Sequence, residues 1–206
     1  MRSIHRESLP RRAALRLPIH ALACFSLSFL AFQANAKNLA EPKLKSSSVL
    51  IVDQSDSSVL YSRNPDVAAP IASITKLMTA LVVLDAKQPL DEPIQITEAD
   101  RDYPKGSFSR LTVGATLTRG DLMHLALMAS ENRAAHALGN NYPGGITAMV
   151  AAMNAKAKSL GMSSAHFVEP TGLSDENVAS PADLSKLVMA AAQEIEEHTS
   201  ELQSPC

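Results

Sequence analysis

The chain carries the sequence ASITKLMTA at residues 72–80, and this stretch decides its fold. Apolar residues continue at helical spacing beyond it, so the pattern predicts a helix over 71–85. Ser73 and Lys76 form an S-x-x-K element near the start of that helix, where residues three apart share one face. A helix N-terminus adds positive potential and unpaired N–H groups, which suit a developing oxyanion.

The S-x-x-K element has the residue types that a serine nucleophile requires. A serine hydroxyl is a poor nucleophile at neutral pH and needs a base within reach, and lysine serves when burial or a second cation lowers its pKa. The chain contains 23 serines and nine lysines, so chance alone can supply such an element. The pattern therefore needs support from a second motif.

Ser130-Glu131-Asn132 provides an S-x-N element between two predicted helices, 118–129 and 133–138. A serine at such a junction can relay a proton, and an asparagine can hold a substrate amide. Two alternatives remain open: Ser62-Arg63-Asn64 also fits S-x-N, and Ser or Asn between helices is usually a cap.

The order of these motifs resembles the low-molecular-mass penicillin-binding proteins, the D-alanyl-D-alanine carboxypeptidase and endopeptidase group of serine peptidases (peptidase family S11). The segments Phe167–Leu173 (FVEPTGL) and Ser180–Leu184 (SPADL) also match that group and are most similar to its endopeptidase branch. The likeness runs from about residue 47 to about residue 192.

This resemblance implies that Ser73 is the acylated nucleophile, Lys76 its general base, Ser130 a proton relay and Asn132 a substrate-binding residue. The implied partners are peptidoglycan peptides, with β-lactams as covalent ligands. No cofactor and no metal ion is expected, and the six histidines show no ligand spacing; His124 and His136 are interpreted as helix-surface residues.

The expected fold is α+β and helix-rich, a β-lactamase/transpeptidase-like serine peptidase fold. A β-hairpin is predicted from the apolar runs 49–52 and 59–61, a strand over 165–168, and a final helix capped by Ser180 with Pro181 at its first position. Aromatic residues make up only 4% of the chain, which indicates a core of aliphatic helical faces.

The family's K-T-G motif, which lies beyond the S-x-N element, has no match in the chain. Thr171-Gly172 follows Pro170, which has neither charge nor a backbone donor, so it is rejected as a substitute. Residues 193–206 also do not match the family, and a premature stop or a change of reading frame would explain this. We expect the C-terminal strands of the sheet to be absent and activity to be impaired, the alternative being a non-catalytic remnant that binds wall peptides weakly.

A second enzyme class is considered because Glu169-Pro170 follows the S-x-N element, as in the deacylating segment of class A β-lactamases. The remainder of that segment does not fit: Leu173 lies one residue too far along, and Ser174 stands where Asn is required. A β-lactamase is therefore the minor alternative.

The N-terminus has the pattern of a signal peptide over residues 1–36. Five arginines precede an apolar run over 17–32, which is too short for a membrane anchor, and Ala34-Asn35-Ala36 ends it. We expect cleavage after Ala36, a linker over 37–48, a partial peptidase domain over 49–192 and a periplasmic location.

The mature chain expected from this cleavage has 14 basic and 20 acidic residues. Nucleic acid is therefore an unlikely class of partner on charge grounds. Cys206 is the one cysteine left, so no internal disulfide is expected.

Overall fold

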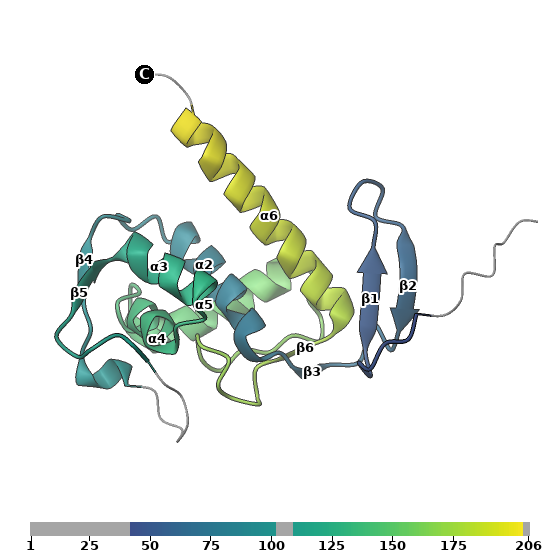
Figure 1. Ribbon diagram of the computed structural model, residues 1–206, viewed down its shortest axis with the longest axis horizontal. Helices are drawn as coiled ribbons and strands as arrows, with labels where there is room; N and C mark the ends of the chain where they lie inside the picture. Colours follow the sequence, from purple (N-terminus) through teal and green to yellow (C-terminus); the bar gives the residue numbers. More distant parts are fainter. Residues whose placement is uncertain (1–41, 102–108, 204–206) are drawn as a thin grey trace, which may run out of the picture. The chain divides into compact units, whose positions relative to one another are not determined.

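Residues 42–101 and 109–203 are described by a computed structural model, with side chains as far as Glu194 (Figure 1). The chain divides into two compact units, Met1–Leu44 and Lys45–Cys206, and every element below belongs to the second. The predicted signal peptide, 1–36, lies outside the described residues. Among the described residues, every helix is too short or too polar to span a bilayer.

The N-terminal hairpin consists of β1 (Val49–Val52) and β2 (Val59–Arg63), paired antiparallel with Val49 opposite Arg63. This confirms the predicted hairpin. Asp53 forms its turn, because the carboxylate accepts from Ser55 N at 2.8 Å and from Ser55 Oγ at 2.6 Å.

The central helix is α2 (Thr75–Asp85), which follows the short 3-10 helix η1 (Ala72–Ile74) and confirms the helix predicted over 71–85. It contacts each of the helices α3 (Arg119–Met128), α4 (Asn132–Asn140), α5 (Gly145–Ser159) and α6 (Pro181–Gln203). Its fully buried apolar side chains include Met78, Leu81, Val82 and Val83. Burial on every side explains why this helix is apolar nearly all round.

Short strands and a 3-10 turn lie between some of these helices. Between α2 and α3 lie β4 (Pro93–Gln95), η2 (Glu98–Asp100) and β5 (Thr116–Thr118), with β4 antiparallel to β5. Thr118 then caps α3, accepting from Asp121 N at 3.0 Å, in agreement with the start of the helix predicted over 118–129. Helices and short antiparallel strands together confirm the α+β class.

The predicted strand over 165–168 is wrong. His166 forms one bridge with Val178, and Ala165 N donates to Met162 O at 3.4 Å. The other two backbone donors go to side chains: Phe167 N donates to Asn154 Oδ1 at 3.0 Å and Val168 N to Asn177 Oδ1 at 2.7 Å. Two asparagines thus take the hydrogen bonds that a neighbouring strand would have made.

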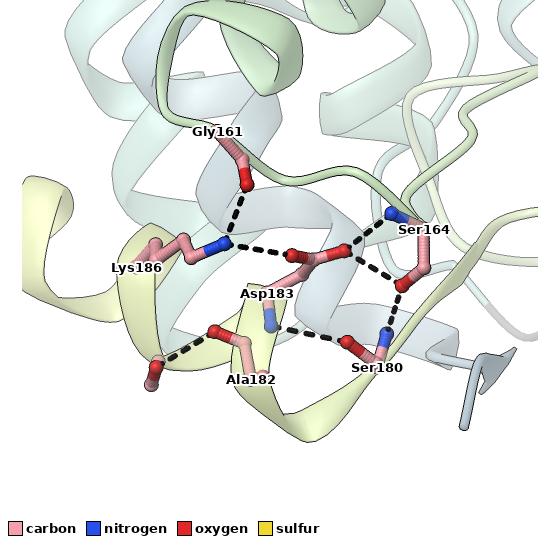
Figure 2. Close-up of polar contacts among 7 residues, drawn as sticks. Gly161, Ser164, Ser180, Ala182, Asp183 and Lys186 are labelled. Carbon is pink, nitrogen blue, oxygen red and sulfur yellow. Dashed lines mark hydrogen bonds and ion pairs between the residues drawn. The ribbon is translucent and has the colours of Figure 1, made fainter. Parts of the chain in front are cut away.

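The final helix, α6, begins as predicted at Pro181, with Ser180 Oγ accepting from Asp183 N at 3.2 Å. The Asp183 carboxylate binds Ser164 through N (2.7 Å) and Oγ (2.6 Å) and pairs with Lys186 (Figure 2). These contacts fasten the start of α6 to the loop after α5. Just before α6, β6 (Val178–Ala179) pairs antiparallel with β3 (Ala69–Pro70).

Candidate active site

The structure brings the two predicted serines together. Ser130 Oγ donates to Ser73 Oγ at 2.8 Å, although Ser73 lies in η1 and Ser130 in the turn between α3 and α4. Both serines are exposed to solvent. Ser73 Oγ is therefore accessible to a substrate and has a second hydroxyl within proton-transfer distance.

Lys76 lies beneath the serines, with only 2% of its surface exposed. Its Nζ donates to Ser73 Oγ at 3.1 Å, to Asn132 Oδ1 at 2.8 Å and to the backbone oxygen of Thr171 at 2.6 Å. The four residues predicted for the site thus meet in one cluster, together with Thr171.

The contacts of Lys76 suit both protonation states of its amine. An ammonium has three donors, and these three oxygens can accept them. A neutral amine has two donors and one lone pair. If the two N–H groups stay on Asn132 and Thr171, whose oxygens cannot donate, the lone pair faces Ser73 Oγ, which is the arrangement that a general base needs.

Backbone geometry at Ser130 and Asn132 directs both side chains toward α2. Ser130 has φ 53°, in the left-handed region, which costs a non-glycine residue about 1–3 kcal/mol and is common at functional sites. Asn132 is the first residue of α4, and Glu131 caps that helix by accepting from Arg133 N at 3.2 Å. The turn between the helices is therefore defined by both backbone strain and a cap.

The loop that carries Thr171 packs directly under the nucleophile. Gly172 has φ 83°, and a Cβ at this position would lie 1.8 Å from the backbone oxygen of Ala72. Thr79 Oγ1 donates to Pro170 O at 2.7 Å. On sequence grounds Thr171-Gly172 is rejected as a K-T-G substitute and Thr171 has no predicted role in the site, because a backbone carbonyl leaves no signal in the sequence.

Glu169, the residue that suggested a β-lactamase, is occupied by its own loop. Its carboxylate accepts from Thr171 N at 2.6 Å, Gly172 N at 2.6 Å and Asn177 Nδ2 at 2.8 Å. A carboxylate with these donors has little remaining capacity to activate a water molecule, which argues against the β-lactamase alternative.

A cavity of about 330 Å³ opens beside the two serines and Lys76. Its apolar wall comes from Ile74, Leu77, Ala126 and Leu127 of the η1–α2 segment and α3. Ser73 therefore borders a pocket that can hold a small aliphatic group.

Among the described residues, no histidine takes part in the hydrogen bonds that join Ser73, Lys76, Ser130 and Asn132. His124 is exposed, as interpreted from the sequence, whereas His136 is half-buried, with Nδ1 3.6 Å from Asp100 Oδ1 and 3.1 Å from Asn140 Nδ2. The surface interpretation of His136 is thus only partly right, because η2 covers it. Among the described residues no three His, Cys, Asp or Glu side chains form a metal-binding group.

The chain is similar to one family of known proteins. A family model described as D-alanyl-D-alanine carboxypeptidase, peptidase S11, matches residues 35–204. A D-alanyl-D-alanine endopeptidase of Pseudomonas aeruginosa is 55% identical over 74% of this chain and 49% of its own length. An endopeptidase of the same name from Escherichia coli is 48% identical over 86% of this chain and 60% of its own length. The chain thus spans about half to three fifths of these relatives.

Solved structures show the same similarity. The Streptomyces K15 DD-transpeptidase superposes with a TM-score of 0.70 and 28% identity, covering 75% of this chain and 63% of that one. A D-alanyl-D-alanine carboxypeptidase from Mycobacterium tuberculosis H37Rv superposes with a TM-score of 0.69 and 30% identity, covering 77% and 60%. The fold is therefore that of the DD-transpeptidases and penicillin-binding proteins, as expected from the sequence.

Proposed function

The chain belongs to the D-alanyl-D-alanine carboxypeptidase family, peptidase S11, and from this premise we propose that it is a serine peptidase acting on the D-alanyl peptides of peptidoglycan through an acyl-enzyme. The observation that carries the proposal is the contact of Ser73 Oγ with both Ser130 Oγ and the buried Lys76 Nζ. A nucleophile, a base and a second hydroxyl are the groups that acyl transfer needs.

In the first half of the reaction, Lys76 Nζ takes the proton of Ser73 Oγ as that oxygen attacks the carbonyl carbon of a D-alanyl residue. The resulting tetrahedral oxyanion collapses, the C–N bond breaks, and the leaving amine takes a proton delivered through Ser130 Oγ. An ester on Ser73 remains. In the second half, water attacks the ester, Ser73 Oγ regains its proton, and the peptide acid leaves.

We propose that the chain acts as an endopeptidase. The bond that it cleaves is then one whose leaving amine belongs to a cross-linked peptide. Three relatives named endopeptidase are 55%, 48% and 39% identical to this chain, whereas five named carboxypeptidase are 35%, 32%, 30%, 28% and 26% identical. Incubation with a cross-linked muropeptide dimer and with a D-alanyl-D-alanine pentapeptide separates the two activities. Release of D-alanine with the dimer left intact would reject the endopeptidase assignment.

Labelling with a fluorescent β-lactam tests the proposed chemistry, because a cyclic amide of this kind acylates the nucleophile of penicillin-binding proteins. We expect mass spectrometry to find the adduct on Ser73 and Ser73→Ala to abolish it. Ser159→Ala, at the exposed end of α5, is the control and should label as the wild type does. An adduct on another serine would contradict the assignment.

We also propose export to the periplasm with removal of residues 1–36, supported by the arginines, the apolar run and Ala34-Asn35-Ala36. Mass analysis of the product from a cell that exports it should give an N-terminus at Lys37. A product that keeps residues 17–32 in the membrane fraction would contradict this proposal.

A further inference from the structure

One peptide group separates two oppositely charged side chains beside the nucleophile. Lys76 Nζ donates to Thr171 O at 2.6 Å, and Gly172 N, in the same peptide group, donates to Glu169 Oε1 at 2.6 Å. The peptide bond is trans, so its C=O and N–H point in opposite directions. Glu169 and Lys76 therefore lie on opposite sides of the Thr171–Gly172 peptide, connected through it.

The Glu169 carboxylate is held firmly on its side of this peptide. Oε2 accepts from Thr171 N at 2.6 Å and from Thr171 Oγ1 at 2.5 Å, and Oε1 also accepts from Asn177 Nδ2 at 2.8 Å. Hydrogen bonds to a charged acceptor are about twice as strong as neutral ones. The orientation of the Thr171 carbonyl is thus set by the carboxylate on the opposite side.

Asn177 fastens this loop to the start of the central helix. It has no exposed surface; its Nδ2 donates to Thr75 Oγ1 at 3.2 Å, and its backbone oxygen accepts from Ile71 N at 3.0 Å. Since Ile71 and Thr75 flank Ser73 in the chain, the loop and the nucleophile are fixed to the same segment. Movement of Glu169 would therefore be transmitted to the surroundings of Lys76.

We propose, on the basis of the function proposed above, that Glu169 is a positioning residue for Lys76 that acts through the Thr171–Gly172 peptide. Its carboxylate aims the Thr171 carbonyl at Lys76 Nζ and polarises that peptide, which makes the carbonyl a stronger acceptor. The carbonyl then keeps one N–H of the neutral amine occupied while the lone pair faces Ser73. The negative charge also favours the protonated amine at the stage when it holds the serine proton.

Other charged groups on the elements around Lys76 have partners of their own. On α4, Glu131 accepts from Arg133 N, and the Arg133 guanidinium donates to Leu111 O. On α2, Asp85 pairs with Lys156 of α5 at 2.9 Å, and on α6, Asp183 pairs with Lys186 at 3.1 Å. Glu169 differs from these carboxylates because it binds the same peptide group as Lys76, the one between Thr171 and Gly172.

The test is a direct titration of Lys76 by NMR in the full chain labelled with ¹³C-lysine, with the resonance assigned by its loss in Lys76→Arg. In Glu169→Gln we expect the midpoint of the Lys76 titration to fall by about one pH unit, because the protonated amine loses a charge and an oriented acceptor. Asp183→Asn is the matched control. It removes a carboxylate that also binds loop donors but lies far along the chain from Lys76, and it should leave the midpoint unchanged (Figure 2).

An unchanged midpoint in folded Glu169→Gln, or an equal fall in Asp183→Asn, would overturn the proposal. If Glu169→Gln does not fold, Glu169→Asp keeps the charge and withdraws the carboxylate by one methylene, and we expect a smaller fall in the same direction. Labelling of the wild type by a β-lactam is measured in parallel. If the wild type is not labelled, the proposed function is rejected. The titration then still decides whether Glu169 positions Lys76.

Discussion

Ser130 Oγ lies 2.8 Å from Ser73 Oγ, and Ser130 makes this contact from a left-handed backbone conformation, φ 53°. The strain is located at the residue proposed to protonate the leaving group. A non-glycine residue keeps such a conformation only where the surrounding structure holds it there. The geometry of the site therefore depends on a strained residue as well as on buried ones.

We predict that Ser130→Ala slows acylation of Ser73 by a β-lactam about 10²–10⁴-fold, because the leaving amine loses its proton donor. Rapid-mixing fluorescence measures the rate. Ser130→Gly is the matched variant: it should be equally slow, yet more stable than Ser130→Ala by roughly 1–2 kcal/mol, since glycine adopts positive φ without the steric penalty of a Cβ. Acylation of Ser130→Ala at the wild-type rate would exclude a relay role.

Gly172→Ala should disrupt the site through a steric clash. The new Cβ would lie 1.8 Å from Ala72 O, so either the loop or the nucleophile's backbone must move. We expect a loss of several kcal/mol in the free energy of unfolding and loss of Ser73 acylation.

Gly161→Ala is the control for that substitution. Gly161 also has a positive φ, 70°, but nothing lies within 4 Å of the added Cβ, so only the backbone penalty of about 1–2 kcal/mol applies. Chemical denaturation of both variants measures the difference. Equal destabilisation would show that the close approach to Ala72 has no consequence.

Asp183 should make the free energy of unfolding depend on pH in the acidic range. Burial alone would raise the pKa of this carboxyl, but the hydrogen bonds from Ser164 and the Lys186 charge outweigh it and hold the pKa below its ordinary value. The folded state therefore binds this proton less readily than the unfolded state does. The stability that Asp183 contributes is present above the unfolded-state pKa of about 4 and is lost as pH falls through the lower folded-state value.

Asp183→Asn tests this sign. At pH 7 we expect the variant to be less stable than the wild type by about 1–3 kcal/mol, because Ser164 loses a charged acceptor. The difference should shrink as pH falls below about 4, where the unfolded wild type takes up this proton, and should level off below the lower folded-state pKa, where folded Asp183 is neutral as well. Melting curves from pH 7 to pH 3 measure it, and a gap that stays constant would contradict the assignment.

The local part of this structure could be predicted from the sequence. Thr118 and Ser180 cap α3 and α6 by binding residues three positions along the chain, and the S-x-x-K spacing places Ser73 and Lys76 on one face. Such contacts depend on few neighbours. The sequence patterns that encode them are therefore reliable.

The remote part could not be predicted from the sequence. Asn177 takes the backbone donor of Val168, so the apolar run over 165–168 does not form the expected strand. Thr171 contributes a carbonyl that any residue would have, and Glu169 acts on the site through a peptide group. Neither contact can be predicted from the residue types in the sequence, because both depend on the path that the backbone takes in the folded chain.

The contacts of Lys76 also have a kinetic consequence. Asn132 lies 56 positions from Lys76 along the chain and Thr171 lies 95 positions away, so two large loops must close before the amine meets these oxygens. Closing such loops costs chain entropy, and structures rich in distant contacts fold slowly. Helix α2 can form early, but its lysine acquires these partners only when the last loops dock. A β-lactam adduct on Ser73 would therefore report the end of folding, and its rate of appearance during refolding would time that final step.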